Sequence, residues 1–71
     1  MTRRFEFVGG NSAKFWEIEI NNTSVIVRYG RLGTNGQQQE KHFADTAAAH
    51  DHAEKLVAEK TRKGYRETAA A

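Results

Sequence analysis

The chain has 71 residues, 38% of them hydrophobic, and a formal net charge of +2. So short a chain predicts one small domain with a thin core, which argues against the deep cleft of a typical enzyme. Cysteine is absent, which excludes disulfides, thiolate zinc sites and cysteine nucleophiles. The sequence also lacks the apolar run of a membrane span or a signal peptide, so we expect a soluble, cytoplasmic protein.

The first half of the chain carries patterns with a period of two, which is typical of half-buried strands. These patterns run from Arg3 to Val8, from Phe15 to Ile20 and from Ser24 to Tyr29. Gln37 to Phe43 is polar, but it follows Asn35-Gly36, a pair that favours a tight hairpin turn, and we assign it as an exposed edge strand. Short connectors rich in turn-forming residues predict that neighbouring strands pair antiparallel as a meander.

The pattern becomes helical from Ala47 to Lys63. Asp45 or Thr46 can cap the first turn, and Gly64 supplies the left-handed residue that ends the helix. The apolar side chains of this segment fall on one stripe, formed by Ala49, Ala53, Leu56 and Val57. Such a stripe is the surface that a sheet would cover.

These elements predict an α+β domain in which a four-stranded antiparallel sheet packs against one long C-terminal helix. We expect residues 1–67 to form this domain and residues 68–71 to form a disordered tail. Because sheet and helix must cover each other in so small a chain, one group of residues should be buried together. Its members are Trp16, Ile18, Ile20, Val25, Val27, Leu56 and Val57.

The residue types that carry chemistry do not form a recognisable catalytic or metal-binding motif. His50 and His52 point in different directions on a helix, and His42 lies on a strand without a partner at ligand spacing. Glu17 and Glu19 share a strand face, where solvation is their expected role. We therefore expect no catalytic activity, no metal and no cofactor.

Two local groups of cations have the character of a binding site for a polyanion. The segment Lys60 to Arg66 holds four cations and no acid, although a solvated surface explains it equally well and the helix dipole favours cations there. In the segment Arg28 to Gly36, three glycines follow an aromatic residue and are flanked by two arginines. This combination suits a sugar or base beside a phosphate, whereas a hairpin that needs glycines to bend is the alternative.

The sequence resembles the WGR domain, a family named for a Trp-Gly-Arg motif. The family occurs in DNA-dependent poly(ADP-ribose) polymerases and in many bacterial proteins, some of them free-standing. The matching segments are Phe15-Trp16-Glu17-Ile18 with Lys14 before it, Tyr29 to Thr34, Gly36-Gln37, Glu59-Lys60-Thr61 and Gly64-Tyr65. They resemble the strand, the signature hairpin and the helix end of a free-standing bacterial-type copy, in which Tyr-Gly-Arg replaces Trp-Gly-Arg.

This resemblance implies a fold and a set of roles. In the polymerases the domain packs an antiparallel sheet on a helix and helps to recognise DNA breaks. The motif Trp stacks on the sugar or base of an exposed end, the motif Arg also contacts neighbouring protein domains, and a Lys near the helix end lies close to the DNA backbone. By resemblance these roles fall to Tyr29, Arg31 and Lys60. Tyr keeps a π face but offers less stacking area than Trp.

We therefore expect a non-catalytic module that binds nucleic acid, in the first place DNA ends or phosphate-bearing strands. The predicted site residues are Arg28, Tyr29, Arg31, Lys60, Arg62, Lys63 and Arg66. The alternative is a protein interaction or self-association module that uses the motif Arg and the edge strand Gln37 to Phe43. Alternation would bury Tyr29, whereas the resemblance puts it at the mouth of the hairpin, so we expect it to be partly exposed.

Overall fold

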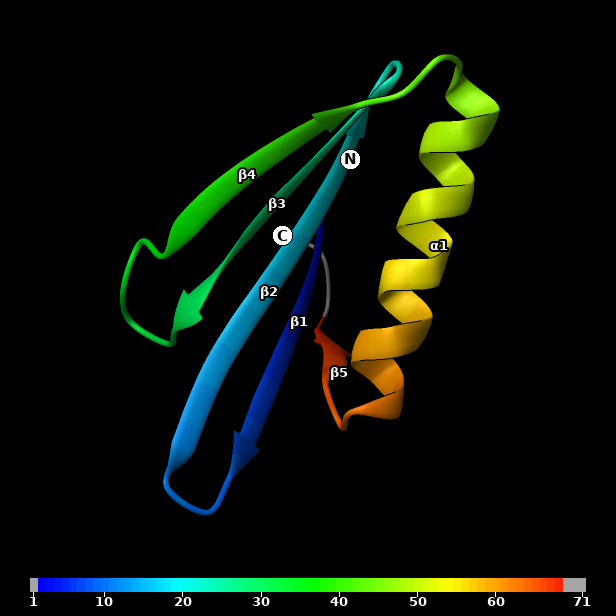
Figure 1. The fold of residues 1–71 in the computed structure, drawn as a ribbon. Coiled ribbons are helices and arrows are strands. Elements are labelled where there is room, and N and C mark those ends of the chain that lie inside the picture. The colour runs from blue at the N-terminus through cyan, green and yellow to red at the C-terminus, as the bar shows by residue number, and fades with distance from the viewer. Residues whose placement is uncertain (1, 69–71) are drawn as a thin grey trace.

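A computed structural model describes residues 2–68 of the chain. The elements are β1 (Thr2–Gly9), β2 (Ser12–Asn21), β3 (Ser24–Arg31), β4 (Gln37–His42), α1 (Thr46–Arg62) and β5 (Arg66–Thr68). The first four strands form an antiparallel meander, and α1 packs on one face of the sheet (Figure 1). These features confirm the predicted α+β class. Within residues 2–68, no helix is long and apolar enough to cross a membrane.

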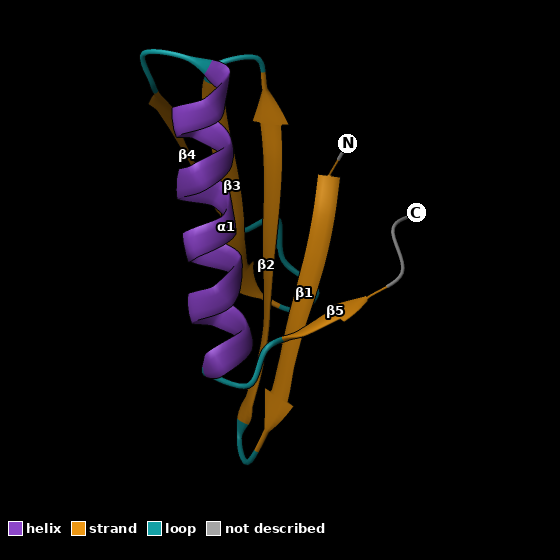
Figure 2. Cartoon of the chain, turned by 90° about the vertical axis from the view of Figure 1, so that its right-hand side faces the viewer, coloured by secondary structure: helices purple, strands orange, loops and turns teal. Residues whose placement is uncertain are grey.

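The sheet has a fifth strand that the sequence patterns did not predict. β5 follows the helix and pairs antiparallel with β1, so the strand order is β4-β3-β2-β1-β5 (Figure 2). Arg3 donates two hydrogen bonds of 2.8 Å to Glu67, and Thr68 Oγ1 donates one of 3.1 Å to the carbonyl oxygen of Arg4. The strand includes Thr68, which we had assigned to the tail, and residues 69–71 lie outside the described part of the chain.

The helix begins and ends at the predicted signals. Asp45 is the N-cap, and its side chain accepts a hydrogen bond of 2.7 Å from the N–H of Ala48. Gly64 has a φ of 104°, which favours glycine and turns the chain toward β5. Two small residues of the helix, Ala49 and Ala53, are buried and let α1 approach the sheet closely.

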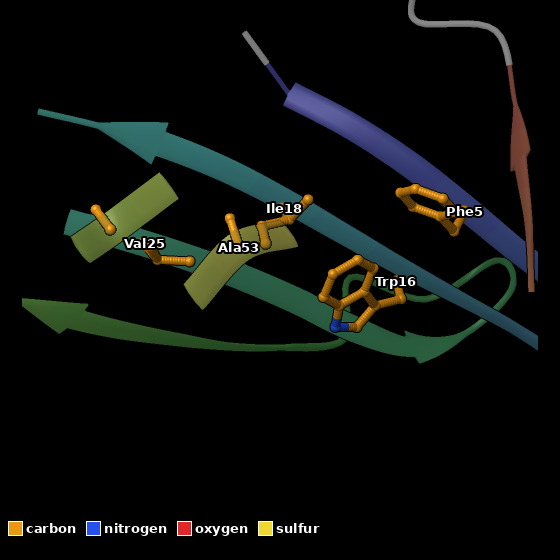
Figure 3. Packing of buried hydrophobic residues seen from close by; sticks show 6 residues of the cluster. Phe5, Trp16, Ile18, Val25 and Ala53 are labelled. Carbon is orange, nitrogen blue, oxygen red and sulfur yellow. The ribbon is translucent and has the colours of Figure 1, made fainter. Parts of the chain in front are cut away.

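The main core lies between α1 and the middle of the sheet. Trp16 is only 3% exposed, and its ring centroid lies 5.5 Å from that of Phe5 on the neighbouring strand. Figure 3 shows both rings, with Ile18 and Val25, on the sheet face that the helix segment carrying Ala53 covers. Of the group predicted to be buried, the remaining members are partly buried against this core: Ile20, Val27, Leu56 and Val57.

The sheet face opposite α1, the helix-free face, also buries one large side chain. Phe15 is 1% exposed, although no helix covers it. The guanidinium carbons of Arg4 and Arg28 lie 4.7 and 5.5 Å from the centroid of its ring. Glu17 holds both arginines, with N–O distances of 2.6 Å to Arg4 and 2.7 Å to Arg28. The expectation that Glu17 is a solvated residue was therefore wrong, because its side chain is only 16% exposed.

This network makes folding stability depend on pH. Burial alone raises the pKa of Glu17, but hydrogen bonds from Arg4 and Arg28 outweigh burial and hold the pKa below its ordinary value of 4.5. A carboxyl with a lowered pKa contributes stability above its ordinary pKa and loses that contribution as the pH falls through the folded value.

We predict that Glu17→Gln lowers stability at neutral pH by about 1 to 3 kcal/mol, because two arginines lose a charged partner. The parent chain should lose stability below about pH 4.5, and the variant should lose less over the same range. Melting temperatures of the two chains against pH test this prediction. Parallel curves would show that Glu17 does not contribute to the acid transition.

We also predict that Trp16→Ala costs about 3 kcal/mol or more, since it removes the largest side chain of a thin core. The whole stability of so small a domain is of similar size, so most of the variant should be unfolded. Circular dichroism during heating measures this effect. A cooperative melt close to that of the parent would contradict the placement of Trp16 in the core.

Candidate functional site

The loop between β3 and β4 positions the residues of the candidate site. Asn35-Gly36 does not form the expected two-residue turn. An Asn-Gly turn of that kind requires positive φ at both residues, but only Gly36 has a positive φ, of 71°. The connection is instead a loop over residues 32–36, in which the N–H and Oγ1 of Thr34 donate to the carbonyl oxygen of Arg31. A Cβ atom on Gly36 would lie 2.7 Å from the Phe15 ring and would also overlap the carbonyl oxygen of Tyr29. The loop is therefore seated tightly against the end of the sheet.

Three of the predicted site residues, Tyr29, Arg31 and Lys60, surround one pocket of about 190 Å³, which we call the basic pocket. It lies where the last turn of α1 meets β2 and β3. Its other lining residues are Lys14, Phe15, Trp16, Gly30 and Tyr65. The lining thus combines three cations with the aromatic rings of Trp16, Tyr29 and Tyr65 and contains no carboxylate, while the Phe15 ring points to the helix-free face.

Two cations of the basic pocket are partners in strand register, and Lys14 and Lys60 have their ammonium groups near aromatic rings, Lys14 Nζ lying 5.9 Å from the ring centroid of Phe7. Lys14 and Arg31 are direct partners across β2 and β3, and like charges in that position destabilise a sheet. Lys60 Nζ lies 5.7 Å from the ring centroid of Trp16 and 5.5 Å from that of Tyr65. Within residues 2–68, none of these three cations forms an ion pair.

Tyr29 is partly exposed, as expected. Its ring packs against the main core and is paired across the strands with Trp16. Its hydroxyl donates a long hydrogen bond of 3.4 Å to Gln37 Oε1. One side of the ring is therefore held by the protein, while the rest contributes to the wall of the basic pocket.

The other four predicted site residues do not line this pocket. Arg28 lies on the helix-free face, where it is held by Glu17, and Arg66 lies on the same face opposite Glu6 of β1. Arg62 and Lys63 are exposed at the end of α1. Lys63 Nζ is also paired with Glu59 at 3.3 Å.

Sequence reasoning missed Lys14 and Tyr65 as members of the site. Lys14 could have been found, because alternation puts it on the face of Trp16 and the short β2–β3 turn sets it opposite Arg31. Tyr65 follows the end of the helix and precedes the unpredicted β5, so no periodic pattern indicated its position.

One Ser–His–acid set occurs among the described residues, away from the basic pocket. Ser24 Oγ lies 2.8 Å from His42 Nδ1, and His42 Nε2 lies 3.6 Å from Glu40, but this Ser–His–acid set does not line the basic pocket. Ser24 and His42 are partners across β3 and β4, and the histidine side chain is 74% exposed. Among the described residues, no group of three or more His, Asp or Glu is arranged to hold a metal ion.

Comparison with known proteins identifies the family. A family model for the WGR domain matches residues 1–71. The chain belongs to the WGR domain family. Over 67 residues it is 42% identical to the protein YehF and 39% identical to the protein YfeS, both of Escherichia coli. These alignments cover 94% of this chain but only 24% and 28% of the two relatives.

A solved relative has the same fold. The crystal structure of a Bacteroides fragilis protein matches with a TM-score of 0.95 and 52% identity, over 97% of this chain and 20% of that one. This WGR domain therefore spans between 20% and 28% of the length of these relatives. WGR domains are generally nucleic-acid-binding modules, and no catalytic family is indicated for the chain.

We predict that Gly36→Ala destabilises this WGR domain by about 2 to 4 kcal/mol, because the new Cβ must displace Phe15 or the Tyr29 backbone. Gly33→Ala is the matched control. It has a positive φ of 89° but nothing within 4 Å of its Cβ position, so it should cost only about 1 kcal/mol. Denaturant unfolding of both variants measures the difference. Equal losses would mean that the loop is not fixed by this contact.

Proposed function

We propose that this WGR domain binds nucleic acid, and DNA ends in particular, through the basic pocket. The observation that carries the proposal is the pairing of Lys14 with Arg31 across neighbouring strands, beside Lys60 and without a carboxylate in the lining. The two opposed cations repel each other in the free protein, so an anion bound between them would remove an unfavourable interaction. Phosphate is the anion that nucleic acids supply.

The aromatic residues of the pocket favour a ligand that carries a sugar or base as well as a phosphate. The partly exposed Tyr29 ring offers a π face and a hydroxyl next to Arg31. An aromatic face beside a guanidinium group suits a sugar or base attached to a phosphate. Stacking of Tyr29 on an exposed end is also the role that the family resemblance implies for it.

The distribution of charge favours the same face. Of the 11 Lys and Arg residues, five are ion-paired. Within residues 2–68, the other six form no ion pair: Lys14, Arg31, Lys41, Lys60, Arg62 and Arg66. Three of these six line the basic pocket. We expect about three to five phosphates to be neutralised, which gives a slope of roughly −3 to −4 in log affinity against log salt.

We predict that Arg31→Glu weakens binding to a 5′-phosphorylated duplex by at least about tenfold, because it removes a charge-assisted hydrogen bond and adds repulsion. Arg66→Glu is the matched control, since it makes the same charge change at an exposed cation on the helix-free face. Fluorescence anisotropy at two salt concentrations compares the variants. Equal losses would indicate attraction by net charge alone, and absence of binding by the parent at low salt would refute the proposal.

The second candidate function is docking of a protein or of another copy of the chain. It is favoured by β4, an edge strand whose six residues are all exposed and whose outer backbone groups can pair with a further strand. The motif residue Arg31 could contribute to such a contact. Concentration-dependent self-association without DNA binding would favour this function over the first.

A further inference from the structure

We propose that a groove beside the basic pocket receives unpaired bases, so that the domain prefers a duplex with a single-stranded overhang to a blunt duplex. This inference rests on the proposed function, because it extends the same binding site. It adds a ligand class, the unpaired nucleobase, and a surface for it between α1 and the β3–β4 edge of the sheet.

The groove and the basic pocket are continuous. The groove has a volume of about 690 Å³ and shares Trp16, Tyr29 and Lys60 with the pocket. The remainder of its lining comes from β3, β4 and one side of α1: Val25, Val27, Gln39, Glu40, Lys41, His52, Leu56 and Glu59. A strand whose terminal phosphate lies in the pocket therefore has a direct path into the groove.

The two volumes indicate that the pocket and the groove bind different parts of a nucleotide. At about 190 Å³ the basic pocket is smaller than the roughly 300 to 1,000 Å³ of sites that enclose a small organic molecule. It has room for a phosphate or the edge of a sugar, but not for a whole nucleotide. The groove lies within that range and is the adjoining place where a base can be accommodated.

The chemistry of the groove suits a base better than a phosphate. Its floor is aliphatic, with Val25 buried and Val27 half-buried, and Leu56 adds apolar surface from the helix. Such a surface gains free energy by covering the face of a base. Glu59 on the rim would repel a phosphate, but its carboxylate can accept a hydrogen bond from an N–H group of a base. Glu40 lines the groove as part of β4, while its side chain alternates to the helix-free face and lies near His42.

Cations stand at both ends of the groove. Lys60 lies at the end that joins the basic pocket, and Lys41 lies at the other end, paired in register with Val25. Val25 and Tyr29 are four residues apart on β3, which corresponds to about 13 Å along the strand. Phosphates can therefore be neutralised at the two ends while the base between them covers the apolar floor.

A protein helix fits this groove less well. It would remove Lys41, Lys60 and Glu59 from water, which costs free energy unless each charge finds a partner. A protein strand would pair with the outer edge of β4 instead of entering the groove. The mixture of apolar floor and charged rim therefore favours a ligand that is itself apolar on its faces and polar at its edges.

The test compares three 5′-phosphorylated DNA duplexes by fluorescence anisotropy with the parent chain. One is blunt, one has a short overhang of unpaired thymidines, and one has an abasic overhang of the same length. We expect the thymidine overhang to bind about tenfold more tightly than the blunt duplex, the lower end of the effect of one stacked base. The abasic overhang keeps its phosphates but has no base to cover the apolar floor, so it should show only a small part of this gain.

Lys41→Glu locates the effect in the groove, and Lys55→Glu is its control. Both lysines are exposed, but Lys55 lies outside the groove lining. Lys41→Glu should remove most of the overhang preference and leave blunt-end binding nearly unchanged, whereas Lys55→Glu should keep the preference. Melting curves confirm that both variants remain folded.

The outcomes separate this inference from the proposed function. Equal binding of blunt and overhang duplexes, an equal gain from the abasic overhang, or full preference in Lys41→Glu would overturn the groove inference. In each of these cases blunt-end binding that depends on Arg31 would still support the proposed function. Absence of binding to every duplex would overturn both.

Discussion

Two consecutive aromatic residues, Phe15 and Trp16, are buried on opposite faces of β2. A helix covers only one of these faces, so the other must be shielded differently. Trp16 fills the space under α1, while Phe15 lies beneath the two arginines that Glu17 holds in place. The central strand is thus buried on both sides in a chain too short to build two conventional hydrophobic layers.

This arrangement determines where the site residues lie. Phe15 contacts the position of Gly36 and so fixes the loop that follows Arg31. Trp16 contacts Lys60 from the other face and thereby links the end of α1 to the strands. The basic pocket forms where these two contacts meet, at the junction of loop, sheet and helix end. Its geometry therefore depends on the same two rings that stabilise the fold.

Most of the fold could be predicted because its strands and helix have clear periodicity and capping residues. β5 could not, since three polar residues carry no pattern and pair with β1 through contacts that span nearly the whole chain. For the candidate site, the sequence indicated residues but not their arrangement. Tyr29, Arg31 and Lys60 line one pocket, but Arg28 sits one residue from Tyr29 and therefore points to the other face. Alternation along β3 already assigns Arg28 and Tyr29 to opposite faces, so the same rule that predicted the core also excludes Arg28 from the pocket.

The division of arginines and lysines between the two faces bears on how the domain would recognise a ligand. On the helix-free face, the charges of Arg4 and Arg28 are matched by Glu17 and Glu6, and both arginines cover Phe15. On the helix side, Lys14 and Arg31 are set against each other without a carboxylate in the pocket lining. Like charges in this register destabilise a sheet, and the phosphate that we propose as ligand would offset that effect. Charge thus stabilises the fold around Phe15, whereas in the basic pocket it is left available, which is the asymmetry expected of a surface that binds an anion.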